Sequence, residues 1–192
     1  MASDEELLNQ LQAAAHTRVA GGFDPLDEIV PDLIEQFAIS DDEDDKLTLL
    51  HEVVVDEINA HLHAQSTWTA PTDCDHLDRA FGWLESAGVV SRQHFACCPP
   101  CGRAEIRAEI TAAQEQGRVV RGYVFFHLQA TESAVDGHGL SLCYGSVDPA
   151  TVSHVKIGQL IVDTLREAGL HPTWSGSALH SITVPMRWQK RR

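Results

Sequence analysis

The sequence lacks any long apolar segment and has few basic residues in its first half. No apolar run approaches the roughly 20 residues that a transmembrane helix requires. The first residues, MASDEELLNQ, are acidic where a secretory signal is basic and then apolar. Residues 1–89 hold 20 acidic and 3 basic side chains, whereas residues 90–192 hold 8 and 11. The lack of a membrane span and of a secretory signal leads us to expect a cytoplasmic protein that does not bind membranes. Since an acidic surface repels phosphate groups, we also expect no nucleic-acid binding.

Common catalytic motifs are also missing. The sequence contains no G-x-S-x-G, P-loop, G-x-G-x-x-G or H-E-x-x-H pattern, so hydrolase, NTPase, dinucleotide-binding and metalloprotease functions lose their usual support. The basic cluster RWQKRR at 187–192 is expected to be a solubilising end of the chain. These absences favour a protein without enzymatic activity.

Apolar residues at helical spacing predict that residues 1–88 form an acidic, mostly helical part. Helices are expected over 5–16, 25–37, 46–65 and 76–88. Small residues from Val19 should end the first helix, Pro25 should open the second, and Pro31 should kink or interrupt it. The acidic helices offer a binding surface for an unidentified protein partner.

Residues 89–192 are predicted to form an α+β domain. Strands are expected over 89–95, 119–129, 140–145 and 180–188, with helices over 103–117 and 148–169, the latter starting at Asp148, and a turn over 131–139. This β-α-β-β-α-β order is that of a ferredoxin-like antiparallel sheet, with a less regular α+β sheet as the alternative. Pro185 fits the final strand at a sheet edge, because proline donates no ladder hydrogen bond.

Three of the five cysteines lie close together, in the segment HFACCPPCGRA. An odd number of cysteines in a reducing compartment favours thiols, metal ligands or core residues over disulfides. The expected position of Cys97, Cys98 and Cys101, between a strand and a helix start, stabilises thiolates. Three interpretations remain open: a zinc site, a Cys98-Pro-Pro-Cys101 redox dithiol or metal carrier, and partly buried inert thiols.

A zinc ion would need a fourth ligand from elsewhere in the chain. Cys74 and His127 are the main candidates. Strand alternation places His127 on the same side as Tyr123 and Phe125, where Glu132 is close enough in sequence to orient it or to pair with an arginine. A structural role for His127 is the alternative.

Residues 72–192 resemble a bacterial family that is classified only as a domain of unknown function, and two segments carry the resemblance most specifically. They are the C-C-x-x-C-G segment at residues 97–102 and the H-x-Q-x-T-E segment at residues 127–132. The resemblance covers about residues 72–192, with Ala130 where an acidic residue is expected and Arg103 where a histidine is common. It implies a shared fold and a shared polar cluster, and it implies no established activity.

Together these features predict a non-enzymatic, partner-binding or regulatory protein. Its cysteine loop would hold zinc through Cys97, Cys98 and Cys101, with Cys74 or His127 completing the ligand set. A dithiol redox enzyme or metal carrier is the first alternative. An acidic immunity-type or adaptor protein, in which the cysteines are incidental, is the second.

Overall fold

The computed structural model describes residues 4–192, which form two compact units. Unit 1 comprises residues up to Thr69 together with Gln189–Arg192, and unit 2 comprises Ala70–Trp188. None of the helices in the described part of the chain has the length and apolar character that a bilayer crossing requires. The predicted domain division at residue 88 follows the change from helices to strands, and it stays a prediction.

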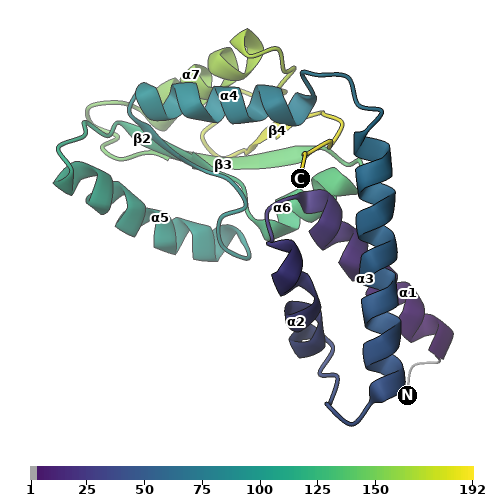
Figure 1. Ribbon diagram of the computed structural model, residues 1–192. Helices are drawn as coiled ribbons and strands as arrows, with labels where there is room; N and C mark the ends of the chain where they lie inside the picture. Colours follow the sequence, from purple (N-terminus) through teal and green to yellow (C-terminus); the bar gives the residue numbers. More distant parts are fainter. Residues whose placement is uncertain (1–3) are drawn as a thin grey trace. The chain divides into compact units, whose positions relative to one another are not determined.

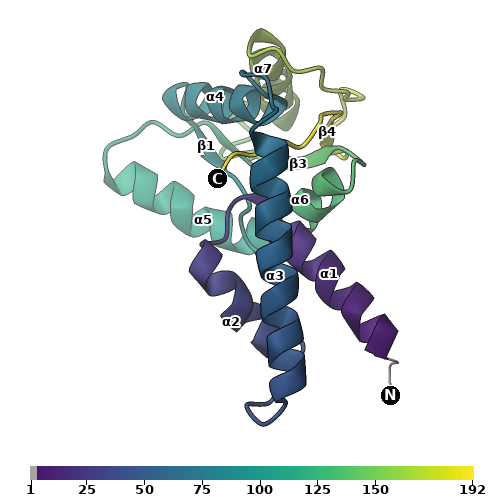
Figure 2. The ribbon, with the colours of Figure 1, turned by 45° about the vertical axis from the view of Figure 1, so that its right-hand side comes forward.

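Three helices form unit 1 (Figure 2): α1 (Asp4–Gly21), α2 (Leu26–Gln36) and α3 (Asp44–Gln65). The buried side chains of their shared core are Leu11, Ala15, Val19, Ile29, Leu33, Ile39, Leu50, Val53 and Val54. Helix α1 continues past Val19, and α2 is a single helix that contains Pro31 in its second turn. The small-residue stretch that begins at Val19 does end this helix, because Gly22, with a positive φ of 78°, follows its last residue, Gly21.

The final residues of the chain pack within unit 1. The Arg192 guanidinium donates hydrogen bonds to the backbone carbonyls of Arg18, Val19 and Asp24 at 2.6–2.7 Å. Its backbone N–H donates to the side chain of Gln65 at 2.7 Å. A guanidinium suits the end of α1, where the last carbonyls lack helical partners and the dipole is negative. The basic end is therefore a docked segment and differs from the solubilising tail that its composition predicted.

Unit 2 contains four helices and a four-stranded sheet (Figure 1). Its elements are α4 (Asp73–Ser86), β1 (Val89–Arg92), α5 (Pro99–Glu115), β2 (Gly122–Phe125), α6 (Leu128–Val135), β3 (Leu140–Ser146), α7 (His154–Glu167) and β4 (Ile182–Val184). The strand order is β1-β2-β3-β4. Strands β1 and β2 are parallel, whereas the β2–β3 and β3–β4 pairs are antiparallel.

The sheet confirms a mixed α and β protein but not the ferredoxin-like arrangement. In that arrangement another strand separates the parallel strands of each β-α-β unit. Here α5 is a crossover that joins direct neighbours, so β1 and β2 pair in parallel and the sheet is mixed. Strand β4 lies at a sheet edge, as predicted, but it ends at Val184, so Pro185 follows the strand and is not part of it.

Several boundaries differ from the sequence prediction. The strands expected over 89–95 and 180–188 are shorter, at Val89–Arg92 and Ile182–Val184, and the helix expected over 103–117 starts earlier, at Pro99. The strand expected over 119–129 ends at Phe125, and residues 128–135 form helix α6 in place of a turn. Helix α7 begins after Ser153, whose hydroxyl accepts a hydrogen bond from the Lys156 N–H. Asp148 instead closes a separate turn, because its carboxylate accepts hydrogen bonds from the Ala150 N–H and the Thr151 hydroxyl.

Helices cover both faces of the sheet (Figure 1). Helices α4 and α7 lie on one face and α5 on the other. Phe126 packs edge-on against Phe81 of α4, with ring centroids 5.7 Å apart, whereas Phe125 belongs to the core under α5 with Val90 and Ile106. The alternation predicted for residues 122–126 is thus confirmed, and the cysteine loop enters α5 on the Phe125 face.

Candidate metal centre

The cysteine loop connects β1 to α5. Cys98 is the N-cap of α5, with φ and ψ of −152° and 167°, and Pro99 occupies the first helical position. Proline suits this position, because its missing N–H has no helical partner there. The expectation that the thiols lie at a helix start is therefore confirmed.

The start of α5 lies unusually close to the sheet at Gly102. A Cβ atom on this residue would come within 2.3 Å of Phe125 Cε2, which is far below van der Waals contact. Phe125 is completely buried and packs against Phe95 and Tyr123 at centroid distances of 5.9 and 6.3 Å. Because Gly102 has no side chain, the first turn of α5, which carries the cysteines, can pack this close to the sheet.

Backbone hydrogen bonds fix the loop that precedes the cysteines. The Phe95 N–H donates to the Phe126 carbonyl at 2.8 Å, and the Leu128 N–H donates to the Ala96 carbonyl at 3.1 Å. His94 and Ala96 have positive φ values of 50° and 60°, a conformation that costs non-glycine residues on the order of 1–3 kcal/mol. Strained residues that the surroundings hold in place often mark functional segments. The backbone conformation of residues 94–96, immediately before the first thiol, is therefore fixed by its surroundings.

The three thiols of the loop converge. The sulfur atoms of Cys97, Cys98 and Cys101 all lie within 4.8 Å of one another, and the first two are 3.5 Å apart. Zinc–sulfur bonds of about 2.3 Å in a tetrahedral site place sulfur atoms roughly 3.8 Å apart. Small side-chain rotations therefore suffice for one ion to contact all three. The predicted cluster is formed by the three residues that sequence spacing selected.

The helix start also separates the proton affinities of two thiols. Hydrogen bonds from the Cys101 backbone N–H and from the Cys101 and Cys97 thiols lower the pKa of Cys98. The Cys101 thiol donates to Cys98, and this bond, the bond to Cys97 and the negative charges of both neighbours raise the pKa of Cys101 to about 12. Cys98 is thus the preferred thiolate, and Cys101 keeps its proton unless a cation or a disulfide takes its place.

Cys74 and Cys143 do not join the cluster. Cys74 is buried in α4, on the opposite face of the sheet from α5 (Figure 1), with 2 % of its surface exposed. Cys143 lies on β3 opposite Phe125, and partial burial raises the pKa of its thiol although the charge of Arg103 opposes this. In residues 4–192, no fourth His, Cys, Asp or Glu accompanies the three cysteines within the 4.8 Å limit.

His127 has a structural partner. It is the N-cap of α6, and its Nδ1 atom accepts a hydrogen bond from the Ala130 N–H at 3.3 Å. This bond places the proton of the neutral ring on Nε2, so neither nitrogen offers a free lone pair to a metal. Burial, and secondly the charge of Arg103, lower the pKa of His127 and favour this neutral form. The expected contact with Glu132, an exposed residue, is replaced by the helix cap.

Sequence reasoning missed a second link between this helix and the loop. His94 Nδ1 lies 2.9 Å from the hydroxyl of Thr131, which is 1 % exposed. The H-x-Q-x-T-E segment is therefore the first turn of α6, and it anchors the cysteine loop. The apolar line of Ala130 and Ala134 at helical spacing is the signal that indicates α6.

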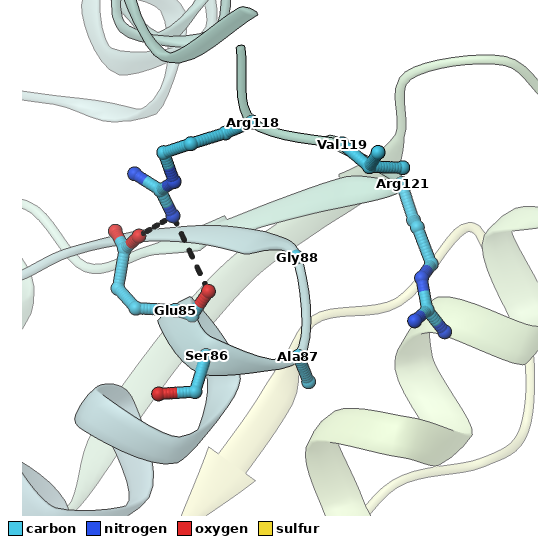
Figure 3. Close-up of a pocket in the computed structure, with 7 residues that line it drawn as sticks. All are labelled: Glu85, Ser86, Ala87, Gly88, Arg118, Val119 and Arg121. Atoms are coloured by element: carbon cyan, nitrogen blue, oxygen red, sulfur yellow. Dashed lines mark hydrogen bonds and ion pairs between the residues drawn. The ribbon is translucent and has the colours of Figure 1, made fainter. Parts of the chain in front are cut away.

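A pocket of about 260 Å³ lies away from the cysteines, between the end of α4 and the segment before β2 (Figure 3). Arg118 turns toward Glu85 and donates to its carboxylate and carbonyl, whereas Arg121 points away from this pair (Figure 3). Burial alone would raise the pKa of Glu85, but hydrogen bonds from the Ser91 N–H, Arg118 and Arg92 lower it. Because the Glu85 carboxylate is fully engaged in these contacts, we regard this pocket as structural.

The fold and the site together define a mixed α and β protein in which a three-cysteine cluster starts a helix. The chain belongs to the family described as domain of unknown function DUF6891, whose model matches residues 4–192. The resemblance inferred from the sequence is thus confirmed, and the match includes the helical N-terminal part. No curated protein and no solved structure matches the chain.

Proposed function

We propose that this protein is a zinc-binding protein of the partner-binding or regulatory kind, with Cys97, Cys98 and Cys101 as its metal ligands. The convergence of the three sulfur atoms within 4.8 Å carries this proposal. Thiolates bind zinc tightly, and the α5 start supplies hydrogen bonds that stabilise them. Zinc would also remove the mutual repulsion that keeps Cys101 protonated. Partner binding through the acidic N-terminal helices remains a prediction.

Metal content tests the zinc proposal directly. Protein purified without added zinc should contain about one zinc per chain, and a thiol reagent should react with fewer cysteines before chelation than after it. A Cys98→Ser variant should lose zinc, because two sulfur ligands bind far more weakly than three. A Cys143→Ser variant removes a cysteine outside the cluster and should retain the metal. Metal-free protein whose loop thiols titrate freely would contradict the proposal.

The unequal proton affinities of Cys98 and Cys101 support a second function, a dithiol oxidoreductase. The Cys98 thiolate would attack a substrate disulfide, forming a mixed disulfide and releasing one substrate thiolate. Cys101, after losing its proton, would attack the Cys98 sulfur and release the second thiolate. The protein would then hold a Cys98–Cys101 disulfide, with two electrons transferred to the substrate, and an external thiol would reduce it again.

Reduction of insulin or glutathione disulfide tests this second function. The wild-type protein should accelerate the reaction, and Cys98→Ser should lower the rate at least about tenfold, because it removes the attacking thiolate. Cys143→Ser is again the matched control and should match the wild type. Equal rates for the wild type and Cys98→Ser would exclude the dithiol function while leaving zinc binding intact.

A further inference from the structure

The three-cysteine cluster lies at the protein surface and lacks a fourth protein ligand in the described chain. Cys97 is exposed, and Cys98 and Cys101 are half-buried. Cys74 lies across the sheet, the Nδ1 atom of His127 accepts a hydrogen bond from the Ala130 N–H, and neither residue belongs to the 4.8 Å group. Structural zinc sites have four protein ligands, whereas sites that bind an external molecule have three protein ligands and an open position. The cluster therefore has the composition of an open site.

We propose that the fourth coordination position of this site binds an external thiolate. This inference rests on the proposed metal binding and adds the class of ligand that completes the site. An ion held by three sulfur atoms favours a further soft ligand, and four thiolates form a common tetrahedral zinc set. The positive end of the α5 dipole offsets part of the added negative charge.

Glu105 is the internal competitor for the open position. It lies on α5, one turn after Cys101, and its charge opposes the ionisation of Cys98. Its carboxylate is outside the 4.8 Å group of the three sulfur atoms. A carboxylate is also a harder ligand than a thiolate, so an external thiol should displace it from an ion that three sulfur atoms already hold.

Cobalt(II) reports on both the metal and the fourth ligand. The full-length protein is freed of metal, loaded with cobalt(II) under reducing, thiol-free conditions, and titrated with 2-mercaptoethanol. The sulfur-to-cobalt charge-transfer absorbance should first show three thiolates and then rise by about one third as a fourth sulfur atom binds. The rise should saturate, and the cobalt should stay bound through gel filtration.

The outcomes separate this inference from the proposed function. No cobalt or zinc binding would overturn both. Bound cobalt with an absorbance that 2-mercaptoethanol leaves unchanged, or cobalt that the thiol removes, would overturn the external thiolate alone. A thiol response that appears only in Glu105→Gln would also overturn it, because Glu105 would then occupy the position in the native protein.

The same titration identifies the source of the thiolate. A rise that depends on 2-mercaptoethanol at constant molecular mass supports a small thiol. A four-sulfur spectrum that appears without added thiol as the protein concentration increases, together with a doubled mass, assigns the fourth sulfur atom to a second copy of the chain. Both outcomes support an open site that takes an external thiolate.

Discussion

Gly102→Ala should destabilise unit 2 by about 2 kcal/mol, although alanine favours a helix by roughly 1 kcal/mol over glycine. The reason is the 2.3 Å approach that a new Cβ atom would make to Phe125 Cε2. Phe95 and Tyr123 pack against this buried ring, so it has no room to move away. The start of α5 must shift instead and carry the cysteine turn with it. Urea unfolding and zinc affinity measure the two effects.

Gly82→Ala is the matched control. Gly82 is also a helical glycine of unit 2, in α4, but a Cβ atom added to it would meet no heavy atom outside its own helix within 4 Å. This variant should gain stability, by about 1 kcal/mol, and should leave zinc affinity unchanged. In a double-mutant cycle, Phe125→Leu should partly rescue Gly102→Ala. Equal stabilisation by the two alanines would show that the close approach at Gly102 does not constrain α5.

Local signals in the sequence predicted much of the cysteine site. The helix predicted over 103–117 placed the cysteines just before a helix start, which lies at Pro99 in the structure, and the strand before them was recognisable from Val89 and Val90. The spacing of the cysteines then placed three thiols in one short turn. These features depend on residues within about one helical turn of each other, and for this reason a single sequence was sufficient.

The pairing of strands that lie far apart in the sequence could not be predicted in the same way. Strand β1 is short, and its parallel partner was determined by α5 crossing to the neighbouring strand, which sequence periodicity does not report. Helix α6 was missed because His127 is a rare N-cap and because Phe125 and Phe126 continue the strand pattern up to it. The position of Cys74, across the sheet, follows from the same topology.

The role of Arg192 could not be predicted either, because the partners of its guanidinium lie more than 160 residues away in the sequence. Composition described only a basic segment, and such segments are usually solvated. The structure shows instead that the Arg192 guanidinium donates hydrogen bonds to three backbone carbonyls around the end of α1. The guanidinium of Arg192 also affects half-buried His61. Burial, and secondly the charge of Arg192, lower the pKa of His61.

Arg192→Ala should destabilise unit 1 by about 2 kcal/mol, since three charge-assisted hydrogen bonds are lost and water replaces them only in part. It should also raise the pKa of His61, because the positive charge of Arg192, which lowers that pKa, is removed. Arg192→Lys should preserve most of the pKa shift but lose most of the stability, because an ammonium group cannot span the three carbonyls. NMR titration of the histidines and urea unfolding measure these effects.

Arg166→Ala is the control for the loss of an arginine side chain elsewhere in the protein. Arg166 is an exposed residue of α7 whose ion pair with Asp163 spans 3.7 Å, so its removal should change stability by less than about 0.5 kcal/mol. A His61 pKa that is the same in Arg192→Ala and in the wild-type protein would mean that residues 189–192 do not stay docked in solution. If Arg192→Ala and Arg166→Ala lose the same amount of stability, the Arg192 guanidinium has no special role at the end of α1. A difference of about 1.4 kcal/mol between them, a factor of ten in the unfolding equilibrium, would establish that role.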